Sequence, residues 1–437
     1  MTSCSAGGSP SGSSTPIADS LSLSLSNSTI TVSAGGAIGR VTANVMRTNS
    51  TGSISLAVSG LPTGASVLYD QQPGTGSTGV IAFNPGTAAA GSYALTVQAT
   101  DGTATTTSIS TLVIGPGTAS LLSTPIVWAS TAPVISAVSN ATHSIVAIKD
   151  PSVVYYNNKW HVYATTADSA GNYNMAYFSF TDWSSASSAT PYYMDATSGF
   201  SGYHCAPQVF YFAPQSKWYL IYQSGPPQYS TTSDITQPST WTKPQSFFAS
   251  QPSNVPNWID FWVICDSSNC YMFFSGDDGR FWRSQTTIGN FPSGFGTPVL
   301  VMQAANAHDL FEATNVYALK GLNQYLTLIE AMDSTTYHRY FRAFISTALD
   351  GDLTPISAAS SWSHPFAGIN NVTFGHGITS WTNDISHGEM LRDGYDQTMT
   401  IDSTKLQYLY QGVSPSTPSS TSYGLLPWQL GILTRTN

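Results

Sequence analysis

The strongest constraint on the fold of this chain is a repeat in its C-terminal part. Each copy has a polar or small residue, an apolar strand, a short turn and a second strand rich in aromatic residues. Four copies are DPSVVYYNNKWHVYAT from Asp150, APQVFYFAPQSKWYLIY from Ala206, DFWVICDSSNCYMFFS from Asp260 and EATNVYALKGLNQYLTLIE from Glu312. A stretched fifth copy, EMLRDGYDQTMTIDSTKLQYLYQG, begins at Glu389. The copies recur about every 50–55 residues, which is close to the period of propeller blades. We therefore predict an all-β fold whose C-terminal domain is a five-bladed β-propeller.

Residues 17–116 have a different sequence pattern. Short alternating strands such as LSLSLSNSTITVS and GSYALTVQATDG are broken by Gly and Pro, a pattern typical of an immunoglobulin-like β-sandwich. The segment resembles modules that bacteria attach to secreted enzymes. Its only aromatic residues are Tyr69, Phe83 and Tyr93, too few for an ordinary sugar platform, so a spacer or stabilising module is favoured over a sugar-binding one.

Four segments follow from these patterns. We expect a flexible tail over residues 1–16, the sandwich over 17–116, a linker over 117–127 and the propeller over 128–437.

Charged residues are scarce, at 8% of the chain against about 25% in an average protein. The net charge of -9 argues against nucleic acid or an anionic membrane as the partner. No apolar run is long enough to span a bilayer, and the first residues lack the apolar core of a signal peptide. We expect a secreted protein whose export signal has been removed. Cys4 is either the lipidated first residue of a cell-surface lipoprotein or a stray cysteine in the tail.

Two of the four cysteines lie at the neck of one predicted hairpin. Cys265 and Cys270 flank the turn DSSN, and strands on either side of such a turn bring these positions opposite each other. We predict a disulfide there, which also fits an oxidising compartment. Cys205 is then unpaired, and we expect it to be buried.

The repeat assigns three carboxylates to one structural point. Asp150, Asp260 and Glu312 fall at the start of the innermost strand of three blades, and these strand starts converge on the propeller axis. Each acid alone has a structural explanation: Asp150 can cap a turn before Pro151, Asp260 can accept bonds from buried backbone amides, and Glu312 can face solvent. Together they favour chemistry, because buried acids are costly unless they are paired.

Two carboxylates in opposite protonation states are what glycoside hydrolysis requires. A neutral acid protonates the leaving oxygen, while an ionised carboxylate activates water or attacks. A third acid nearby raises the pKa of the proton donor by like-charge repulsion. No GxSxG, HExxH or P-loop motif competes with this interpretation.

Long stretches of the chain resemble glycoside hydrolase family 62, a family of α-L-arabinofuranosidases that act on arabinoxylan. They are AIKDP from Ala147, SAGNYNMAYFSFTDWSSASS from Ser169, GFSGYHCAPQVFYFAPQSKWYLIYQ from Gly199, NWIDFWVICDSSNCYMFFS from Asn257, DLFEATNVY from Asp309 and DISHGEMLR from Asp384. The resemblance covers residues 128–437. It implies an exo-acting, monomeric enzyme that releases arabinose from arabinoxylan polysaccharide or oligosaccharide with inversion of configuration.

The resemblance also implies roles for the three acids. Asp150 would be the general base, Glu312 the general acid, and Asp260 the residue that orients Glu312 and keeps its pKa high. Inversion requires a water between base and acid, so we expect the carboxyl groups of Asp150 and Glu312 to be roughly 6.5–9.5 Å apart.

Further site residues follow from the resemblance alone. Lys149, Gln223, Arg392 and Tyr423 would line the sugar pocket, and a calcium ion would lie near the propeller axis beside His387. Because a neutral imidazole is a poor ligand for calcium, His387 would in part order the waters of the ion. The chain departs from the family at Gly424, where relatives often have an asparagine that bonds the xylan chain.

Two alternatives stay open on the sequence. One is a family 43-type arabinanase or xylosidase, which has the same three-acid plan. The other is a sugar-binding propeller that has lost catalysis. The stretches SAGNYNMAYF and ISHGEM favour family 62 over family 43, and the presence of all three acids argues against a loss of catalysis.

Overall fold

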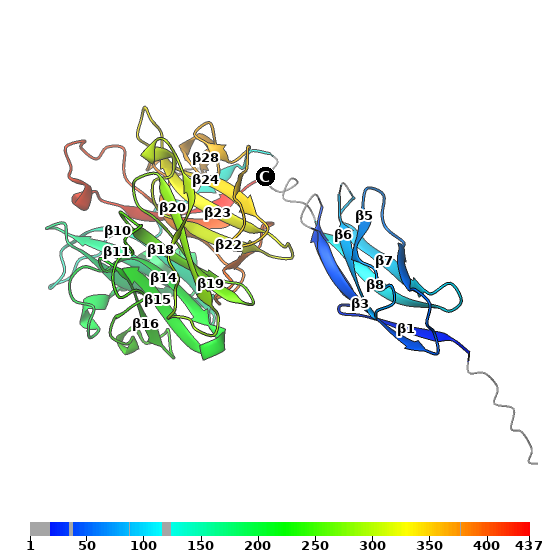
Figure 1. The fold of residues 1–437 in the computed structure, drawn as a ribbon. Coiled ribbons are helices and arrows are strands. Elements are labelled where there is room, and N and C mark those ends of the chain that lie inside the picture. Colours follow the sequence, from blue (N-terminus) through cyan, green and yellow to red (C-terminus); the bar gives the residue numbers. More distant parts are fainter. Residues whose placement is uncertain (1–17, 35–37, 87, 116–123, 376) are drawn as a thin grey trace, which may run out of the picture. The chain divides into compact units, whose positions relative to one another are not determined.

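The computed structural model describes residues 18–34, 38–86, 88–115, 124–375 and 377–437. The chain divides into two compact units, residues 1–117 and 118–437, whose strands are shown in Figure 1. The predicted tail with Cys4, and residues 117–123 of the predicted linker, lie outside the described residues. No helix in the described ranges is long and apolar enough to cross a membrane.

The N-terminal unit is a β-sandwich, as its alternating pattern predicts. Its strands are β1 (Ser20–Leu25), β2 (Thr29–Ser33), β3 (Gly39–Thr48), β4 (Ser55–Ser59), β5 (Ser66–Gln71), β6 (Thr78–Asn84), β7 (Gly91–Thr100) and β8 (Thr105–Gly115). One sheet has the order β1-β3-β6-β5 and the other β2-β8-β7-β4. Alternate residues such as Val41, Ala43 and Val45 of β3 are buried in one core shared by both sheets.

In the described residues of the C-terminal unit, five sheets of four or five strands correspond to the five copies of the repeat, and we call them blades 1 to 5. Blade 1 has β10 (Ile145–Tyr156), β11 (Lys159–Asp168), β12 (Tyr173–Phe180) and β13 (Tyr192–Tyr193). Blade 2 has β14 (Cys205–Phe212), β15 (Lys217–Gln223), β16 (Pro227–Thr232) and β17 (Gln245–Ser246). Blade 3 has β18 (Ile259–Cys265), β19 (Asn269–Ser275), β20 (Arg280–Thr287) and β21 (Val299–Gln303). The five-bladed propeller predicted from the repeat is confirmed.

The last two blades have five strands each. Blade 4 has the order β25 (Thr354–Pro355), β24 (Arg339–Ser346), β23 (Tyr325–Met332), β22 (Asn315–Leu319) and β30 (Thr400–Ile401). Blade 5 has the order β28 (Val372–Phe374), β9 (Trp128–Ser130), β32 (Gln429–Arg435), β31 (Gln407–Gly412) and β29 (Ser386–Met390). A separate hairpin consists of β26 (Ser360–Ser361) and β27 (His364–Pro365).

Blade 5 closes the ring with strands from both ends of the unit. Strand β9 pairs antiparallel with β32, so that Ala129 lies opposite Thr434. The fifth copy of the repeat therefore starts at β29, a few residues before Glu389, and is completed by a strand from the beginning of the unit.

The hairpins form where the turn residues predict them. Strands β10 and β11 are joined by Asn157 and Asn158, which have φ values of 50° and 60°. A two-residue hairpin turn with positive φ at both positions suits asparagine. Across β18 and β19, Cys265 and Cys270 form the predicted disulfide. Cys205 is free and buried, as expected.

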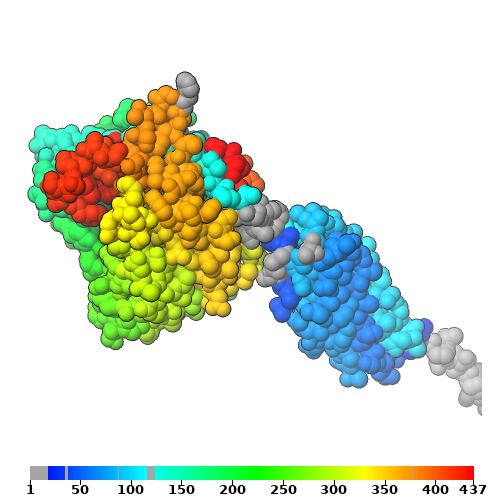
Figure 2. Space-filling view, turned by 90° about the horizontal axis from the view of Figure 1, so that it is seen from above, coloured from blue at the N-terminus to red at the C-terminus, as the bar shows by residue number. Residues whose placement is uncertain are grey.

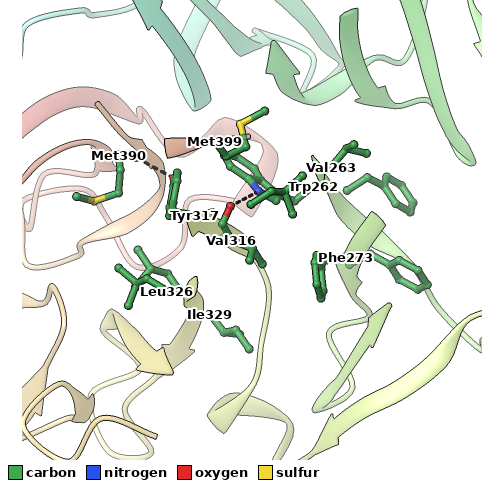
Figure 3. Packing of buried hydrophobic residues seen from close by; sticks show 14 of the residues in the cluster. Trp262, Val263, Phe273, Val316, Tyr317, Leu326, Ile329, Met390 and Met399 are labelled. Atoms are coloured by element: carbon green, nitrogen blue, oxygen red, sulfur yellow. Dashed lines mark hydrogen bonds between the residues drawn. The ribbon is translucent and has the colours of Figure 1, made fainter. Parts of the chain in front are cut away.

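The innermost strands of neighbouring blades are also joined by side chains. Trp262 of β18 donates its Nε1–H to the carbonyl oxygen of Val316 in β22 at 2.8 Å, and the hydroxyl of Tyr317 accepts the N–H of Met390 in β29 at 2.9 Å (Figure 3). These bonds run through a buried hydrophobic cluster, so the strands at the axis are fixed both by packing and by hydrogen bonds.

Candidate active site

Four innermost strands bend at an equivalent residue, which we call the corner residue. The corner residues are Asp150, Ala206, Asp260 and Ala313, and their φ values are 47°, 49°, 55° and 52°. In blades 1 to 3 this residue lies in a register shift between the first and second strands. Positive φ is uncommon outside glycine, and such residues collect at functional sites.

A side chain from another blade accepts the N–H of each corner residue. Gln411 Oε1 accepts from Asp150 at 2.6 Å, Thr165 Oγ1 from Ala206 at 2.8 Å and Gln223 Oε1 from Asp260 at 3.3 Å. We call these contacts the corner hydrogen bonds.

Blades 4 and 5 complete the set of corner hydrogen bonds. Asp260 Oδ2 of blade 3 accepts the N–H of Ala313 at 2.9 Å. Glu330 Oε2 of blade 4 accepts the N–H of His387 in β29 at 2.7 Å. Each blade therefore holds the innermost strand of the next one, and blade 5 holds blade 1 through Gln411.

The predicted equivalence of the three acids is wrong by one residue at Glu312. Asp150 and Asp260 are corner residues, whereas Glu312 lies one residue before the corner residue Ala313. It therefore corresponds to Lys149 in blade 1. The alignment of the repeat cannot reveal this shift, because the left-handed corner has no side-chain signature: two corners carry Asp and two carry Ala.

The acids nevertheless gather around His387. Its Nδ1 is 3.4 Å from Oδ1 of Asp150 and 3.7 Å from Oδ2 of Asp260. Burial alone would lower the pKa of His387, but the carboxylates of Asp260 and Asp150 raise it above its ordinary value. Glu312 interacts electrostatically with Asp260, and its side chain keeps 14% of its surface exposed.

Lys149 lies beside Asp150, the predicted base. Its Nζ is 3.5 Å from Oδ2 of Asp150 and lies 4.8 and 4.9 Å from the ring centres of Tyr173 and Tyr423. Burial alone would lower the pKa of this ammonium group, but the charge of Asp150 leads the interactions that raise it well above its ordinary value. Lys149 is thus a fixed positive charge in the site.

Tyr423 belongs to the surface segment between β31 and β32, which is coloured red in Figure 2. Its residue is 44% exposed, and its hydroxyl lies 3.4 Å from Nζ of Lys149. The structure therefore brings Tyr423 to the predicted pocket. Gln223 also comes close, since it accepts the N–H of Asp260 and donates Nε2–H to the hydroxyl of Tyr203 at 2.7 Å.

Arg392 does not join these residues. It pairs with Glu389, with Nε 2.7 Å from Oε1, and its Nη2 donates to the carbonyl oxygens of Val153 and Val209 at 2.9 and 2.7 Å. Both charged side chains are buried, and a cavity bordered by Arg392 is also lined by the Asn157–Asn158 turn, which follows the C-terminal end of β10, whereas Asp150 lies in the middle of that strand. The structure thus places Arg392 away from the sugar pocket.

The sequence interpretation missed a charged pair next to Glu312. Nη1 of Arg339, the first residue of β24, donates both to Oε1 of Glu312 and to Oε1 of Glu330, the latter at 2.5 Å. Glu330 is fully buried in β23. Its one sequence signal is a charge inside the apolar strand YLTLIEAM, in a chain with few charges.

The ionisation of Asp260 is shifted by its surroundings. Its pKa is raised to about 6, because burial and the charges of Glu312 and Asp150 together outweigh the opposing charge of His387. The folded protein therefore binds this proton more tightly than an unfolded chain, whose pKa would be near the ordinary value of 3.8. The contribution to stability is fully present below about pH 4 and is lost as the pH rises through about 6.

We therefore expect Asp260→Asn, which cannot ionise, to gain stability relative to the parent protein between pH 4 and pH 7. Urea unfolding at several pH values measures the difference in the free energy of unfolding. Asp182→Asn is a suitable control, because Asp182 is exposed and its side chain makes no cap hydrogen bond. A difference between Asp260→Asn and the parent that stays constant across this range would contradict the expectation.

The residues around His387 do not form a calcium site of protein ligands. Calcium takes six to eight oxygen ligands, and the described residues include no group of three or more His, Cys, Asp or Glu side chains arranged to hold a metal. The ring nitrogen of His387 instead faces two carboxylates. No step of the chemistry below is assigned to a metal.

The comparisons with known proteins agree with this geometry. The model of glycosyl hydrolase family 62 matches residues 127–434. Alpha-L-arabinofuranosidase C of Cellvibrio japonicus (strain Ueda107) is 44% identical over 314 residues, which make up 71% of this chain and 47% of that protein. The chain thus spans about half the length of this curated relative.

Solved structures match a similar share of the chain. The catalytic domain of a family 62 α-L-arabinofuranosidase from Coprinopsis cinerea is 48% identical, with a TM-score of 0.68, and the match covers 72% of this chain and 98% of that one. An α-L-arabinofuranosidase of Podospora anserina in complex with cellotriose is 42% identical, with a TM-score of 0.68 and the same coverage. A family 62 hydrolase in complex with xylotriose is 42% identical, with a TM-score of 0.67, over 70% of this chain and 97% of that one.

Proposed function

Because the chain belongs to glycosyl hydrolase family 62, we propose that its propeller is an inverting α-L-arabinofuranosidase that releases arabinose side chains from arabinoxylan. Membership of this family decides against the family 43 alternative. The observation that carries the proposal is the gathering of Asp150, Asp260 and Glu312 with Lys149 and His387 at one end of the axis.

The proposed reaction is a single displacement. Asp150 takes a proton from water, whose oxygen attacks the anomeric carbon of arabinose while the bond from that carbon to the xylose oxygen breaks. Glu312 gives its proton to the leaving oxygen. The reaction adds one water, leaves Asp150 protonated and Glu312 ionised, and solvent then restores both groups.

The other residues support this division of roles. Lys149 places a positive charge 3.5 Å from Oδ2 of Asp150, the carboxylate that takes the proton in this proposal. Asp260 accepts the N–H of Ala313, the residue after Glu312, and so helps to fix the acid. The carboxyl separation of roughly 6.5–9.5 Å between Asp150 and Glu312 stays a prediction.

A polymeric substrate is supported by the surface beside the pocket. Tyr173, which contacts Lys149, and Tyr203 also line a cleft of about 570 Å³ with Asn172 and Asn174. Aromatic rings and amide groups are suited to neutral sugar chains. Relatives were solved with xylotriose and with cellotriose, which further supports a backbone-binding surface.

Defined arabinoxylan oligosaccharides, followed by NMR, test the proposal. We expect free arabinose, first formed with inverted anomeric configuration, and no cleavage of unbranched xylan or of an arabinan backbone. Cleavage of a backbone, or arabinose of retained configuration, would contradict it. No release from any sugar polymer, despite binding, would support the alternative of a non-catalytic propeller.

The remaining expectations are kept as proposals. The Cys265–Cys270 disulfide supports a location outside the reducing cytosol, and we propose that the N-terminal sandwich is an immunoglobulin-like spacer of a monomeric secreted protein. A calcium ion beside His387 would have to take most of its ligands from water. Elemental analysis of the purified protein checks this last proposal.

A further inference from the structure

We propose that Arg339 is the positioning residue of the general acid. Its guanidinium group, anchored on Glu330, holds Glu312 in place and stabilises the carboxylate that remains once Glu312 has given its proton to the leaving oxygen. This inference rests on the proposed function and adds to it a residue whose contribution depends on the leaving group.

Arg339 is fixed from several sides. Its backbone N–H donates to Oδ1 of Asp384 at 2.9 Å. Its guanidinium carbon lies 5.2, 5.6 and 5.9 Å from the ring centres of Phe311, Tyr423 and Trp428. The side chain is only 10% exposed. A guanidinium held in this way offers its N–H groups in a defined direction at little further cost in entropy.

The two carboxylates that accept hydrogen bonds from Nη1 of Arg339 differ in burial. Glu330 is fully buried, and its oxygens also accept the N–H of His387 at 2.7 Å and the hydroxyl of Ser386 at 3.1 Å. Glu312 lies outside any strand, and its side chain is partly exposed. Glu330 is therefore the anchor of Arg339, and Glu312 is the partner that faces the substrate.

This arrangement has a defined chemical use. A carboxyl group has two oxygens, and a hydrogen bond from Arg339 to one of them leaves the other to carry the proton toward the glycosidic oxygen. As that proton moves, negative charge develops on Glu312 next to the guanidinium, which stabilises it in a water-poor site. The benefit exists only when the leaving group takes a proton. A sugar oxygen needs the proton, whereas an activated phenolate such as 2,4-dinitrophenolate leaves without it.

Other charges act on Glu312 from the surrounding strands, and the test has to allow for them. They are Lys149 and Asp150 on β10, Asp260 on β18, Asp277 after β19, Glu330 on β23 and His387 on β29. Among the described residues, Arg339 is the only cation with a direct hydrogen bond to Glu312.

The decisive experiment compares two substrates for the full-length protein. For Arg339→Gln, we expect kcat on an arabinoxylan oligosaccharide to fall about 100-fold, as for loss of one transition-state donor. On 2,4-dinitrophenyl α-L-arabinofuranoside, kcat should fall less than about threefold. Arg339→Lys, which keeps the charge, should recover part of the loss. Equal losses on both substrates would show a merely structural role and overturn the proposal.

A matched control and a double variant guard against misfolding. Arg342 lies on the same strand, and its guanidinium donates to the carbonyl oxygens of Ser360 and Asp309, so Arg342→Gln should not separate the two substrates. In a Glu312→Gln background, Arg339→Gln should cost less than about a further twofold, because the two groups act as a unit. If Arg339→Gln lowered kcat as much in the Glu312→Gln background as in the parent protein, the proposal would be overturned. Failure of the parent protein to release arabinose from arabinoxylan would instead contradict the proposed function itself.

Discussion

Replacing Asp150 by asparagine should lower kcat for arabinose release by about 10³-fold while KM changes little. The asparagine side chain keeps the size of the native one but cannot accept a proton from water, and general base catalysis contributes 10²–10⁴-fold, or about 10³ at its centre. The corner hydrogen bond from the N–H of residue 150 to Gln411 does not depend on the side chain at this position, so the fold should persist. Initial rates on arabinoxylan oligosaccharides measure the loss.

The control for this variant is another aspartate that lies on the surface. Asp352 is exposed, and Asp352→Asn should have the kcat of the parent protein. If Asp150→Asn kept more than about a tenth of the parent activity, the base would have to be another group, and the displacement proposed here would be wrong.

The second large effect is expected at the buried pair of Arg392 and Glu389. Arg392→Met should lower the free energy of unfolding by about 3–5 kcal/mol, because it leaves the buried carboxylate of Glu389 without its charged partner. It also removes the bonds to the carbonyl oxygens of Val153 and Val209, which join blades 1 and 2. The kcat and KM of the molecules that remain folded should be close to those of the parent protein.

Urea unfolding with parallel kinetic measurements tests this expectation. Lys320→Met is a matched control, since its partner is also a carboxylate, at 2.6 Å, but Lys320 is 51% exposed and should contribute about 1 kcal/mol or less. Adding Glu389→Gln to Arg392→Met should recover part of the lost stability. If Arg392→Met had the stability of the parent protein but a raised KM, Arg392 would instead belong to the sugar pocket.

The blades could be predicted from the sequence because a strand and its turn are local features. Alternation of apolar residues, the Asn157–Asn158 turn and the pair of cysteines each determine structure within about ten residues. The spacing between copies then indicates the closed ring. Nonlocal pairing enters only in the last two blades: β30 from the fifth copy joins blade 4, and β9 from the other end of the unit joins blade 5.

The site was less predictable, because its residues meet through the fold rather than through the chain. Arg339 and Glu330 belong to ordinary strands, and their pairing with Glu312 depends on the register of β23 and β24. Arg392 was misplaced for the same reason. It follows His387 by five residues, but β29 ends at Met390, and Arg392 pairs with the buried Glu389 instead of joining the acids around His387.

The corner hydrogen bonds also have a consequence for the order in which the protein is made. Gln411, which accepts the N–H of Asp150, lies on a strand whose blade is complete only when β9 meets β32, and the paired residues Ala129 and Thr434 are far apart in the chain. During synthesis, blades 1 to 4 emerge while Asp150 still lacks this partner. The corner that carries the proposed base is therefore completed late, only when the ring closes.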